Sequence, residues 1–417
     1  SMTGSGPNAP QSLVGRVARV WADEPEAWIN QRVGKIVLKN EGSIHPDFLF
    51  YLLSSSASQD YLVSNSSGSA NQANISGKII ESLPCPKIGY EESAQIAKIL
   101  RELDQKILIN RQTNQTLEAM AQALFKSWFV DFDPVFDNII AHNLAHNNAP
   151  LHNIPEPLLP HAQRRLNVHN VGWGSARQTA SQEFHHLFPQ AFEQSDEPSV
   201  GIQGWIPKGW GAGSLESIAT ALSGFAFKGK DFVDQGEAVL KIKNIKSDRT
   251  VDITDVQRVS MDVAKTAERF KLNDGDIVIA MTGATVGKFG VVVSREGESY
   301  YLNQRVCKLV PKVIGADMFL YSALSKEGVE ESILDAAQGS AQPNISASGI
   351  LSIKQVVPTE NIIKAFSALT NSSYLKMATL KKQSFALESL RDTLLPKLIS
   401  GELRIPDAEQ ASEALAK

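Results

Sequence analysis

The sequence predicts an α+β protein: two tandem mixed α/β domains, each followed by a long helix, with the two helices pairing as an antiparallel coiled coil. Two observations favour this class. Apolar residues recur at steps of three and four over about 40 residues in two segments, and a set of short motifs occurs twice in one order. With 417 residues, 42% of them hydrophobic, the chain is long enough for at least two globular domains.

The first long helix is predicted from Glu91 to about Asp131. A helix of about 40 residues would be about 60 Å long at 1.5 Å per residue, which is longer than a compact domain needs. Asn110 and Asn114 would weaken its seam but can fix the register of pairing. An ordinary long core helix is the alternative. The residues spaced as a coiled-coil seam are Leu100, Leu103, Ile107, Asn110, Asn114, Leu117, Ala121, Leu124 and Trp128.

Motifs near the start of the chain return about 270 residues later, which indicates a tandem duplication with pseudo-two-fold symmetry rather than a solenoid. A second long helix is expected from about Asn361 to Leu398, where Met377, Leu387 and Leu394 continue the seam. The matched motifs are Met2-Thr3-Gly4 with Met281-Thr282-Gly283, Gly15-Arg16-Val17 with Gly287-Lys288-Phe289, Asn30-Gln31-Arg32-Val33 with Asn303-Gln304-Arg305-Val306, Gly68-Ser69-Ala70 with Gly339-Ser340-Ala341, and Asn74-Ile75-Ser76 with Asn344-Ile345-Ser346.

The repeat also predicts the domain boundaries. About 80 residues precede Met281 in the second unit whereas one precedes Met2, so we expect the first domain to be truncated at its N-terminus. Strands are expected at Ala238–Ile242, Ile277–Ala280, Val291–Val293 and Val306–Val310, with helices at Asp262–Phe270 and Ala316–Glu331. The expected parts are a first domain (1–90), a first helix (91–135), a linker (136–200), a second domain (201–358), a second helix (359–402) and a tail (403–417).

The linker is rich in His, Asn and Pro. His142 and His146 have a spacing that can hold a metal on a helix, but prolines follow at once and no acidic or Cys partner is suitably spaced. We therefore expect a loose polar linker and no metal site. The tail after Leu403 is expected to fray.

Composition excludes several classes of protein. A net charge of -4 argues against a generally basic nucleic-acid coat, although it leaves room for a local binding face. Cys85 and Cys307 have no zinc-like spacing and are expected to be reduced thiols of a cytoplasmic protein. No apolar run is long enough to span a membrane, and no secretory signal is expected.

Catalytic motifs are missing from the sequence. The run from Gly283 to Phe289 resembles a phosphate-binding loop, but its glycines are too close and Phe289 stands where Ser or Thr should bind magnesium. Asp131-Phe132-Asp133-Pro134 lacks the second proline of the amino-methyltransferase motif. We expect no catalysis by this chain.

Polar residues around the predicted turns suit nucleic-acid binding. Lys288, in a glycine-flanked turn, could contact a phosphate, and Gln342 and Arg305 carry groups that read base edges. The alternatives are a tight turn, a solvated basic face, and framework roles for Asn303 and Asn344. The DNA-binding candidates are Lys228, Lys230, Lys243, Thr282, Lys288, Arg305, Ser340 and Gln342 in the second unit, and Arg16, Arg32, Ser69 and Gln72 in the first.

These motifs, in this order and duplicated, resemble the specificity subunit of type I restriction–modification enzymes over nearly the whole chain. Ile206-Pro207-Lys208-Gly209-Trp210 opens a domain as in that family. The helix endings, residues 117–129 and 394–403, match as well.

The resemblance implies two target-recognition domains, each reading one half of a split double-stranded DNA site. It implies that the paired helices dock two methyltransferase (modification) subunits and that restriction/translocase subunits complete the complex. S-adenosylmethionine, ATP and magnesium would then belong to those partners, with no cofactor on this chain. The docking candidates are Leu117, Leu124, Phe125, Trp128, Phe129, Leu387, Leu394 and Leu398.

The chain departs from the family pattern because its first recognition domain starts midway. Two other classes therefore stay open. One is a truncated stand-alone DNA-binding or decoy protein, and the other is a coiled-coil scaffold with no role on DNA.

Overall fold

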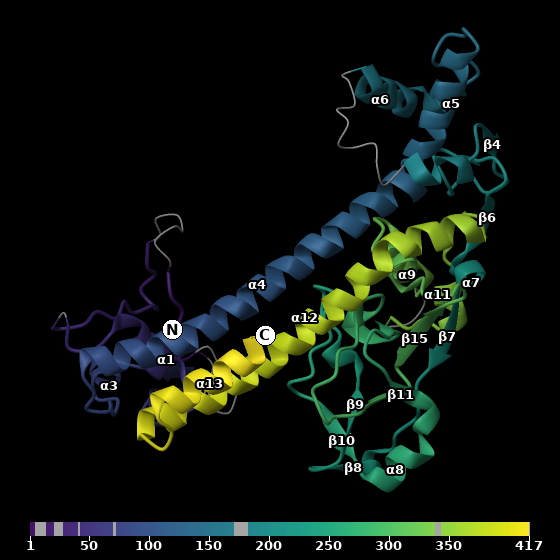
Figure 1. Cartoon of the computed structure of the whole chain (residues 1–417). Helices are drawn as coiled ribbons and strands as arrows, with labels where there is room; N and C mark the ends of the chain where they lie inside the picture. Colours follow the sequence, from purple (N-terminus) through teal and green to yellow (C-terminus); the bar gives the residue numbers. More distant parts are fainter. Residues whose placement is uncertain are drawn as a thin grey trace. The chain divides into compact units, whose positions relative to one another are not determined.

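A computed structural model describes residues 1–4, 14–20, 28–40, 42–69, 72–170, 182–337 and 343–416. The chain divides into two compact units. Unit 1 contains Ser1–Arg111 and Gln383–Lys417, and unit 2 contains Gln112–Lys382. The two long helices, α4 (Tyr90–Phe129) and α12 (Glu360–Ser400), each contribute residues to both units (Figure 1).

Unit 1 combines short helices with a small antiparallel sheet in the order β1-β3-β2. His45, Ser55 and Ser76 each cap the start of a helix by accepting a backbone N–H through the side chain. The elements are β1 (Thr3–Gly4), α1 (Pro46–Ser54), α2 (Ser56–Ser64), β2 (Ser67–Ser69), β3 (Gln72–Asn74) and α3 (Gly77–Glu81).

Unit 2 contains the larger sheets. A five-stranded sheet has the order β11-β14-β9-β10-β8, and a four-stranded antiparallel sheet has the order β13-β12-β15-β7. Strand β12 is buried along its whole length between β13 and β15, which explains its unbroken apolar sequence. The strands are β6 (Gly211–Ser214), β7 (Ala219–Ser223), β8 (Phe232–Val233), β9 (Glu237–Leu240), β10 (Gln257–Val259), β11 (Lys271–Leu272), β12 (Ile277–Ala280), β13 (Phe289–Val291), β14 (Tyr300–Leu302), β15 (Val306–Pro311) and β16 (Lys354–Val357).

Short helices and 3-10 turns connect these strands. Two further two-stranded pairs, β16 with β6 and β4 with β5, complete the unit. The connecting elements are α7 (Leu215–Ile218), η3 (Gly229–Asp231), η4 (Ile242–Asn244), α8 (Met261–Thr266), η5 (Glu268–Phe270), η6 (Gly283–Thr285), α9 (Asp317–Leu324), α10 (Val329–Ala336) and α11 (Ala347–Leu351).

The long helices pair antiparallel, as the seam predicts. In unit 1, Asp104 contacts Arg391 at 2.7 Å, and the Asn110 side chain donates to Gln383 Oε1 at 3.0 Å. In unit 2, the Asn114 side chain donates to the Met377 carbonyl at 3.2 Å, and the Phe125 ring of α4 lies 5.9 Å from the Phe366 ring of α12, centre to centre. In each unit the residue numbers rise along α4 as they fall along α12. The observed helix bounds lie within two residues of the expected ones.

The prediction of a loose polar linker is wrong for its described part. Helix α5 (Asp133–Ala145) is followed by η1 (Glu156–Leu158), α6 (Leu159–Asn170), η2 (Gln182–Leu187) and β4 (Phe192–Gln194), which pairs with β5 (Trp205–Pro207). Phe132, Phe136 and Leu158 are fully buried in the core of unit 2. The apolar residues of α5 have helical spacing, but the surrounding His, Asn and Pro residues obscure that pattern in the sequence.

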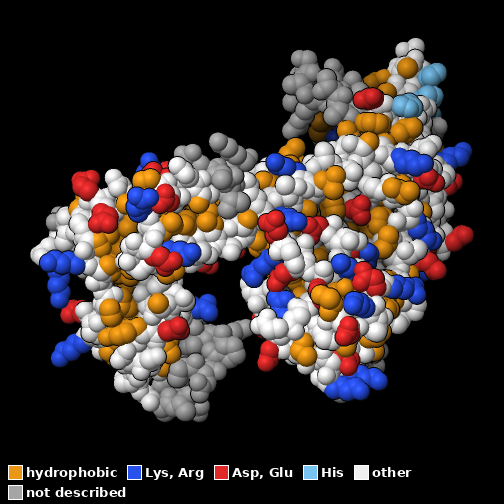
Figure 2. All heavy atoms as spheres, turned by 60° about the horizontal axis from the view of Figure 1, so that its bottom comes forward, with side chains coloured by type: hydrophobic (Ala, Val, Ile, Leu, Met, Phe, Trp, Pro, Cys, Tyr) orange, Lys and Arg blue, Asp and Glu red, His pale blue; other side chains and the backbone are white. Residues whose placement is uncertain are grey.

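The histidines of this segment form no metal site in the described part of the chain. His142 and His146 stack with ring centroids 4.2 Å apart, and the His146 ring contacts the His142 carbonyl instead of a metal. Figure 2 shows several pale-blue histidines gathered in one region of the surface.

The tail is also more ordered than expected. Helix α13 (Ile405–Ala416) buries Ala408 completely in a cluster of unit 1 that includes Leu394 and Leu398. An apolar face that packs on α12 stabilises this helix, so the expectation of a frayed end is wrong. Among the described residues, no helix is long and apolar enough to cross a membrane.

The duplicated motifs make the same backbone hydrogen bonds in both units. Each Met N–H donates to the Arg carbonyl of the Asn-Gln-Arg-Val motif, and each Met carbonyl accepts from the Ile of Asn-Ile-Ser. The lengths are 2.9 and 2.8 Å for Met2 with Arg32 and Ile75, and 3.0 and 2.9 Å for Met281 with Arg305 and Ile345. The neighbouring Thr faces the same Asn in both, Thr3 with Asn74 and Thr282 with Asn344.

The glycine-flanked turn repeats as well. Gly15 donates its N–H to the Ser1 carbonyl at 3.0 Å, and Gly287 donates to the Ala280 carbonyl at 3.1 Å. Their φ angles are +75° and +80°, a backbone conformation that residues other than Gly rarely adopt. This geometry favours the tight-turn interpretation of the motif.

The buried amide of Asn110 gives a test of the seam. Its side chain is 2% exposed and lies within hydrogen-bonding distance of Gln383 and Ser384. Asn110→Ala should lower the free energy of unfolding by about 1–3 kcal/mol, because these buried partners lose a hydrogen bond. Urea denaturation followed by circular dichroism measures this change. Gln105→Ala, on the exposed face of α4, should stay within about 0.5 kcal/mol of the parent. Equal effects of the two substitutions would contradict the role of Asn110.

Candidate nucleic-acid interface

Two loops with basic side chains meet at one edge of the five-stranded sheet in unit 2. Strands β9 and β14 pair in parallel, with Leu240 opposite Leu302 at their carboxyl ends. Because parallel strands end at the same edge of a sheet, the segment after β9 and the segment after β14 lie together. The first carries Lys241 and Lys243, and the second carries Arg305.

Backbone contacts fix the turn that carries Arg305. The Asn303 N–H donates to the Leu240 carbonyl at 3.1 Å, and the Gln304 N–H donates to the Phe225 carbonyl at 2.9 Å. The Asn303 side chain is buried and accepts the Arg305 N–H through Oδ1 at 3.3 Å, as Asn30 does for Arg32 at 3.1 Å. Asn303 therefore has a framework role, and its turn holds Arg305 at the sheet edge.

A third segment reaches the same edge after β7. Gly224 approaches so closely that a Cβ there would lie 2.3 Å from the Asn303 carbonyl oxygen, so only Gly fits. The chain then continues through Phe225 to Lys228 and Lys230, whose side chains are exposed. We name the set Lys241, Lys243 and Arg305 the basic edge.

The charges of the basic edge act on one another. Lys241 is half-buried, and its ammonium lies 3.7 Å from the centre of the Phe232 ring. Burial first, and then the positive charges of Lys243 and Arg305, lower the pKa of Lys241. Lys243 pairs with Asp255 at 2.8 Å, but the Asp255 side chain is 80% exposed, so water screens that pair. The edge therefore has a local positive potential, although Figure 2 shows acidic and basic side chains mixed over much of the visible surface.

Thr282 lies close to the basic edge. The 3-10 turn η6 that follows it packs beside η4, which carries Lys243. Thr282 is half-buried, and its hydroxyl has no hydrogen-bond partner in the part of the chain that the structure describes. The Gly283 N–H donates to the Pro343 carbonyl at 3.0 Å, which places Pro343 near the edge as well. The candidates Ser340 and Gln342 lie outside the described residues.

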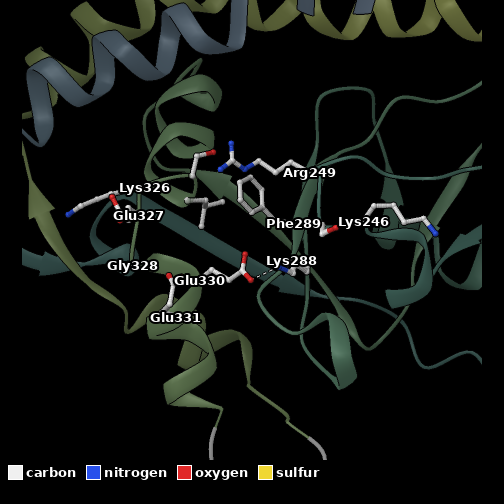
Figure 3. Close-up of a pocket in the computed structure, with 12 residues that line it drawn as sticks. Lys246, Arg249, Lys288, Phe289, Lys326, Glu327, Gly328, Glu330 and Glu331 are labelled. Atoms are coloured by element: carbon white, nitrogen blue, oxygen red, sulfur yellow. Dashed lines mark hydrogen bonds and ion pairs between the residues drawn. The ribbon is translucent and has the colours of Figure 1, made fainter. Parts of the chain in front are cut away.

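Lys288 lies in a different environment. Its ammonium pairs with the Glu330 carboxylate in a hollow of about 170 Å³ that no residue of the basic edge lines (Figure 3). Lys246 also lines the hollow and pairs with Asp252 at 3.2 Å. Because Lys288 has an acidic partner in contact, a phosphate would have to displace a carboxylate there. Glu330 lies 42 residues away in the sequence, so only the tertiary structure reveals this partner.

The candidates of unit 1 are placed only in part. Arg16 and Arg32 are exposed, and their carbonyls accept hydrogen bonds from Ser1 and Met2 within the repeated frame. Ser69 and Gln72 belong to β2 and β3, but their side chains lie outside the described part of the structure. The structure therefore brings together the second-unit candidates Lys243, Thr282 and Arg305, whereas Lys228 and Lys230 are exposed in the segment that precedes β8.

The residues expected to dock partner subunits lie mostly in the interior of the chain. Leu117 and Leu124 are half-buried. The others pack within the cores of the two units, so they hold the helices and domains together and present no outer surface. These buried residues are Phe125, Trp128, Phe129, Leu387, Leu394 and Leu398. Their seam spacing is a signal of burial in the core and does not indicate an exposed docking surface.

Two further residues belong to the candidate interface. The sequence places Lys241 in a cluster of basic residues before the central strand, and the structure places it at the sheet edge beside Lys243 and Arg305. Gln304 is exposed beside Arg305 and carries an amide that can pair with adenine.

A duplicated fold with a basic sheet edge indicates a binding protein, and comparison with known proteins identifies the family. The family model described as "Type I restriction modification DNA specificity domain" matches residues 12–119 and 207–384. The chain therefore belongs to the family of type I restriction–modification specificity subunits. Members of this family are non-catalytic.

Curated relatives agree with this assignment. The chain is 28% identical over 383 residues to the type I restriction enzyme HindI specificity subunit of Haemophilus influenzae, covering 88% of this chain and 80% of the relative. It is 23% identical over 378 residues to the MjaIX specificity subunit of Methanocaldococcus jannaschii, covering 91% and 73%.

Solved structures of such subunits match most of this chain, with low TM-scores. The type I S subunit from M. genitalium has a TM-score of 0.41 and 14% identity, over 86% of this chain and 74% of that one. The HsdS subunit from Thermoanaerobacter tengcongensis has a TM-score of 0.28 and 13% identity, over 87% and 71%. The family assignment rests on the sequence match.

Proposed function

We propose that this chain reads a bipartite double-stranded DNA site, with each recognition domain contacting one half-site. The observation that carries the proposal is the basic edge of unit 2, formed by two segments that lie at one side of a sheet. The lysines there suit phosphates, and Arg305 with Gln304 can reach base edges. In unit 1, Arg32 occupies the position that corresponds to Arg305, and Arg16 the position that corresponds to Lys288.

The charge pattern supports binding by a local edge rather than by the whole surface. The net charge of the chain is -4, so general attraction to DNA is weak. Screened pairs such as Lys243 with Asp255 can exchange the carboxylate for a phosphate at little cost in free energy. Lys288, which contacts Glu330, is a weaker candidate for the phosphate contact.

We further propose that the helices dock two methyltransferase (modification) subunits, with restriction/translocase subunits completing a cytoplasmic complex. S-adenosylmethionine, ATP and magnesium would be bound by those partners. The exposed apolar residues of the helices are better docking candidates than the buried seam. They are Leu108 and Ile109 in unit 1, and Met120 and Leu375 in unit 2, each more than half exposed.

A stand-alone DNA-binding or decoy protein would share the basic edge but would have no use for apolar residues on the outer helix faces. A coiled-coil scaffold would need the helices but neither the basic edge nor its supporting turns. The proposed specificity subunit accounts for both features.

The basic edge makes a first prediction about DNA. Lys243→Ala and Arg305→Ala should each weaken binding to duplex DNA and reduce the slope of log binding constant against log salt by about one, because one phosphate contact is lost. For Arg305→Ala, an added loss on cognate DNA of about 1–3 kcal/mol would indicate base reading. Fluorescence anisotropy at several salt concentrations measures both quantities on cognate and scrambled duplexes.

Lys312→Ala is the matched control for these variants. Lys312 is exposed and follows β15, whereas Arg305 precedes it, so the two cations lie at opposite ends of one strand. The control should bind like the parent. If Lys243→Ala and Arg305→Ala bind as Lys312→Ala does, the DNA interface lies elsewhere.

Purification from the source cell tests the proposed partners. The tagged chain should retain a DNA methyltransferase after nuclease treatment, because the contact is between proteins. Binding of DNA without a methyltransferase would favour the decoy protein. Absence of both would favour the scaffold.

The helix pair makes a prediction about the gap between half-sites. A copied heptad inserted into both helices, after Gln112 and after Leu380, keeps the seam in phase and lengthens each helix by about 10.5 Å. At about 3.4 Å per base pair, the preferred gap should grow by about three base pairs while the half-site bases stay the same. Selection from a library of random duplexes measures both the preferred gap and the half-site bases. An unchanged gap, or changed half-site bases, would contradict a helix pair that sets the spacing.

A further inference from the structure

Glu118 on α4 connects that helix to the second recognition domain. Its Oε1 atom lies 2.8 Å from the Tyr321 hydroxyl of α9, 3.1 Å from Nη1 of Arg249, and 2.7 Å from the Gln122 side-chain amide. Tyr321 and Arg249 come from separate parts of the domain. One carboxylate oxygen therefore receives donors from two elements of the domain and one from its own helix.

The geometry of both domain residues fits a dedicated contact. Tyr321 is 3% exposed, and its burial and the charge of Glu118 raise the pKa of its hydroxyl, so it remains a donor at neutral pH. Arg249 has a φ of +63°, which is uncommon for residues other than Gly, and its guanidinium lies 5.9 Å from the centre of the Phe289 ring. The surrounding structure holds this arginine in place to reach Glu118.

Unit 1 has a corresponding contact. Tyr51 of α1 occupies the repeat position of Tyr321, because Asp47-Phe48-Leu49-Phe50-Tyr51 matches Asp317-Met318-Phe319-Leu320-Tyr321. The Tyr51 hydroxyl donates to Asp104 at 2.8 Å, and Arg391 contacts the same carboxylate at 2.7 Å. Each unit thus joins a tyrosine, a carboxylate and an arginine.

Both carboxylates belong to α4, although simple duplication would place the second on α12. The residue of α12 at the repeat position of Asp104 is Tyr374, which instead donates to the Gly275 carbonyl at 2.6 Å. Lys382 of α12 also contacts Asp274, at 3.2 Å. The second domain therefore contacts α12 through Asp274 and Gly275. It contacts α4 through Tyr321 and Arg249, which both bind Glu118. Loss of the Glu118 contact would leave the domain attached but less restricted in angle.

We propose that Tyr321, Glu118 and Arg249 are positioning residues that set the orientation of the second recognition domain on the helix pair, and thereby the tolerance of the gap between half-sites. Tyr51, Asp104 and Arg391 do the same for the first domain. This inference rests on the proposed function, because gap tolerance has meaning only for a protein that reads a bipartite site.

Tyr321→Phe tests the inference, because it removes one hydroxyl and keeps the buried ring. In the full complex from the source cell, the variant should bind a duplex with only the second half-site as the parent does. Its preference for the correct gap over a gap one base pair longer or shorter should fall about tenfold. Competition binding with these duplexes measures both quantities, and thermal unfolding checks the fold.

Tyr300→Phe is the matched control. Tyr300 donates to Glu298, which contacts Arg258 at 2.6 Å, so it belongs to a similar tyrosine–carboxylate–arginine set. That set lies within the recognition domain and touches neither long helix. The control should keep the gap preference of the parent.

The outcomes separate this inference from the proposed function. Loss of gap preference in Tyr321→Phe alone supports the positioning role. Gap preference retained in Tyr321→Phe, or lost equally in both variants, overturns it while the bipartite reading stands. A parent complex with no gap preference overturns the bipartite function, and this inference with it.

Discussion

Each Met-Thr-Gly segment is held by hydrogen bonds to two segments elsewhere in the sequence, and the arrangement of each recognition domain depends on this. In unit 2 the Met281 N–H and carbonyl bind Arg305 and Ile345, and Thr282 pairs with Asn344. These bonds fix the turn that presents Arg305 and place η6 beside η4. The same bonds recur in unit 1, so these motifs keep one backbone geometry in both units.

Electrostatics distinguishes two groups of cations that look alike in the sequence. Lys288 contacts Glu330 in a hollow that Lys246, Arg249 and Lys326 line together with Glu327 and Glu331, so one carboxylate in contact compensates part of its charge. Lys243 and Arg305 lie at an open sheet edge, where burial first, and then their positive charges, lower the pKa of Lys241. A phosphate would displace Asp255 from Lys243 at the edge and Glu330 from Lys288 in the hollow, but the Asp255 side chain is 80% exposed and the Glu330 side chain 42%, so water screens the pair at the edge more strongly. The sheet edge is therefore the better place for a polyanion.

The sequence allowed the long helices, the central strands and the duplication to be predicted, because periodicity and repeated motifs are local signals. The ion pairs of the site could not be predicted, since Lys288 and Glu330 meet only through tertiary structure. Because His, Asn and Pro obscure the apolar positions of α5, the sequence predicts a linker where the structure has a packed segment. The spacing of the helix seam predicts burial but does not show which faces of the helices remain exposed. Phe125 and Trp128, expected from that spacing to dock partner subunits, instead form part of the core.

The two halves of the chain are equivalent in backbone frame but not in their contacts to the helices. Tyr51 and Tyr321 hold matching positions, yet both donate to carboxylates of α4. After duplication, each copy must keep its own fold, so the frame residues stay fixed, whereas the helix contacts depend on the neighbouring helix and can diverge. A recognition domain transferred to the other position would meet different helix residues there. Compatibility with α4 is therefore a constraint on the second domain that its own sequence does not reveal.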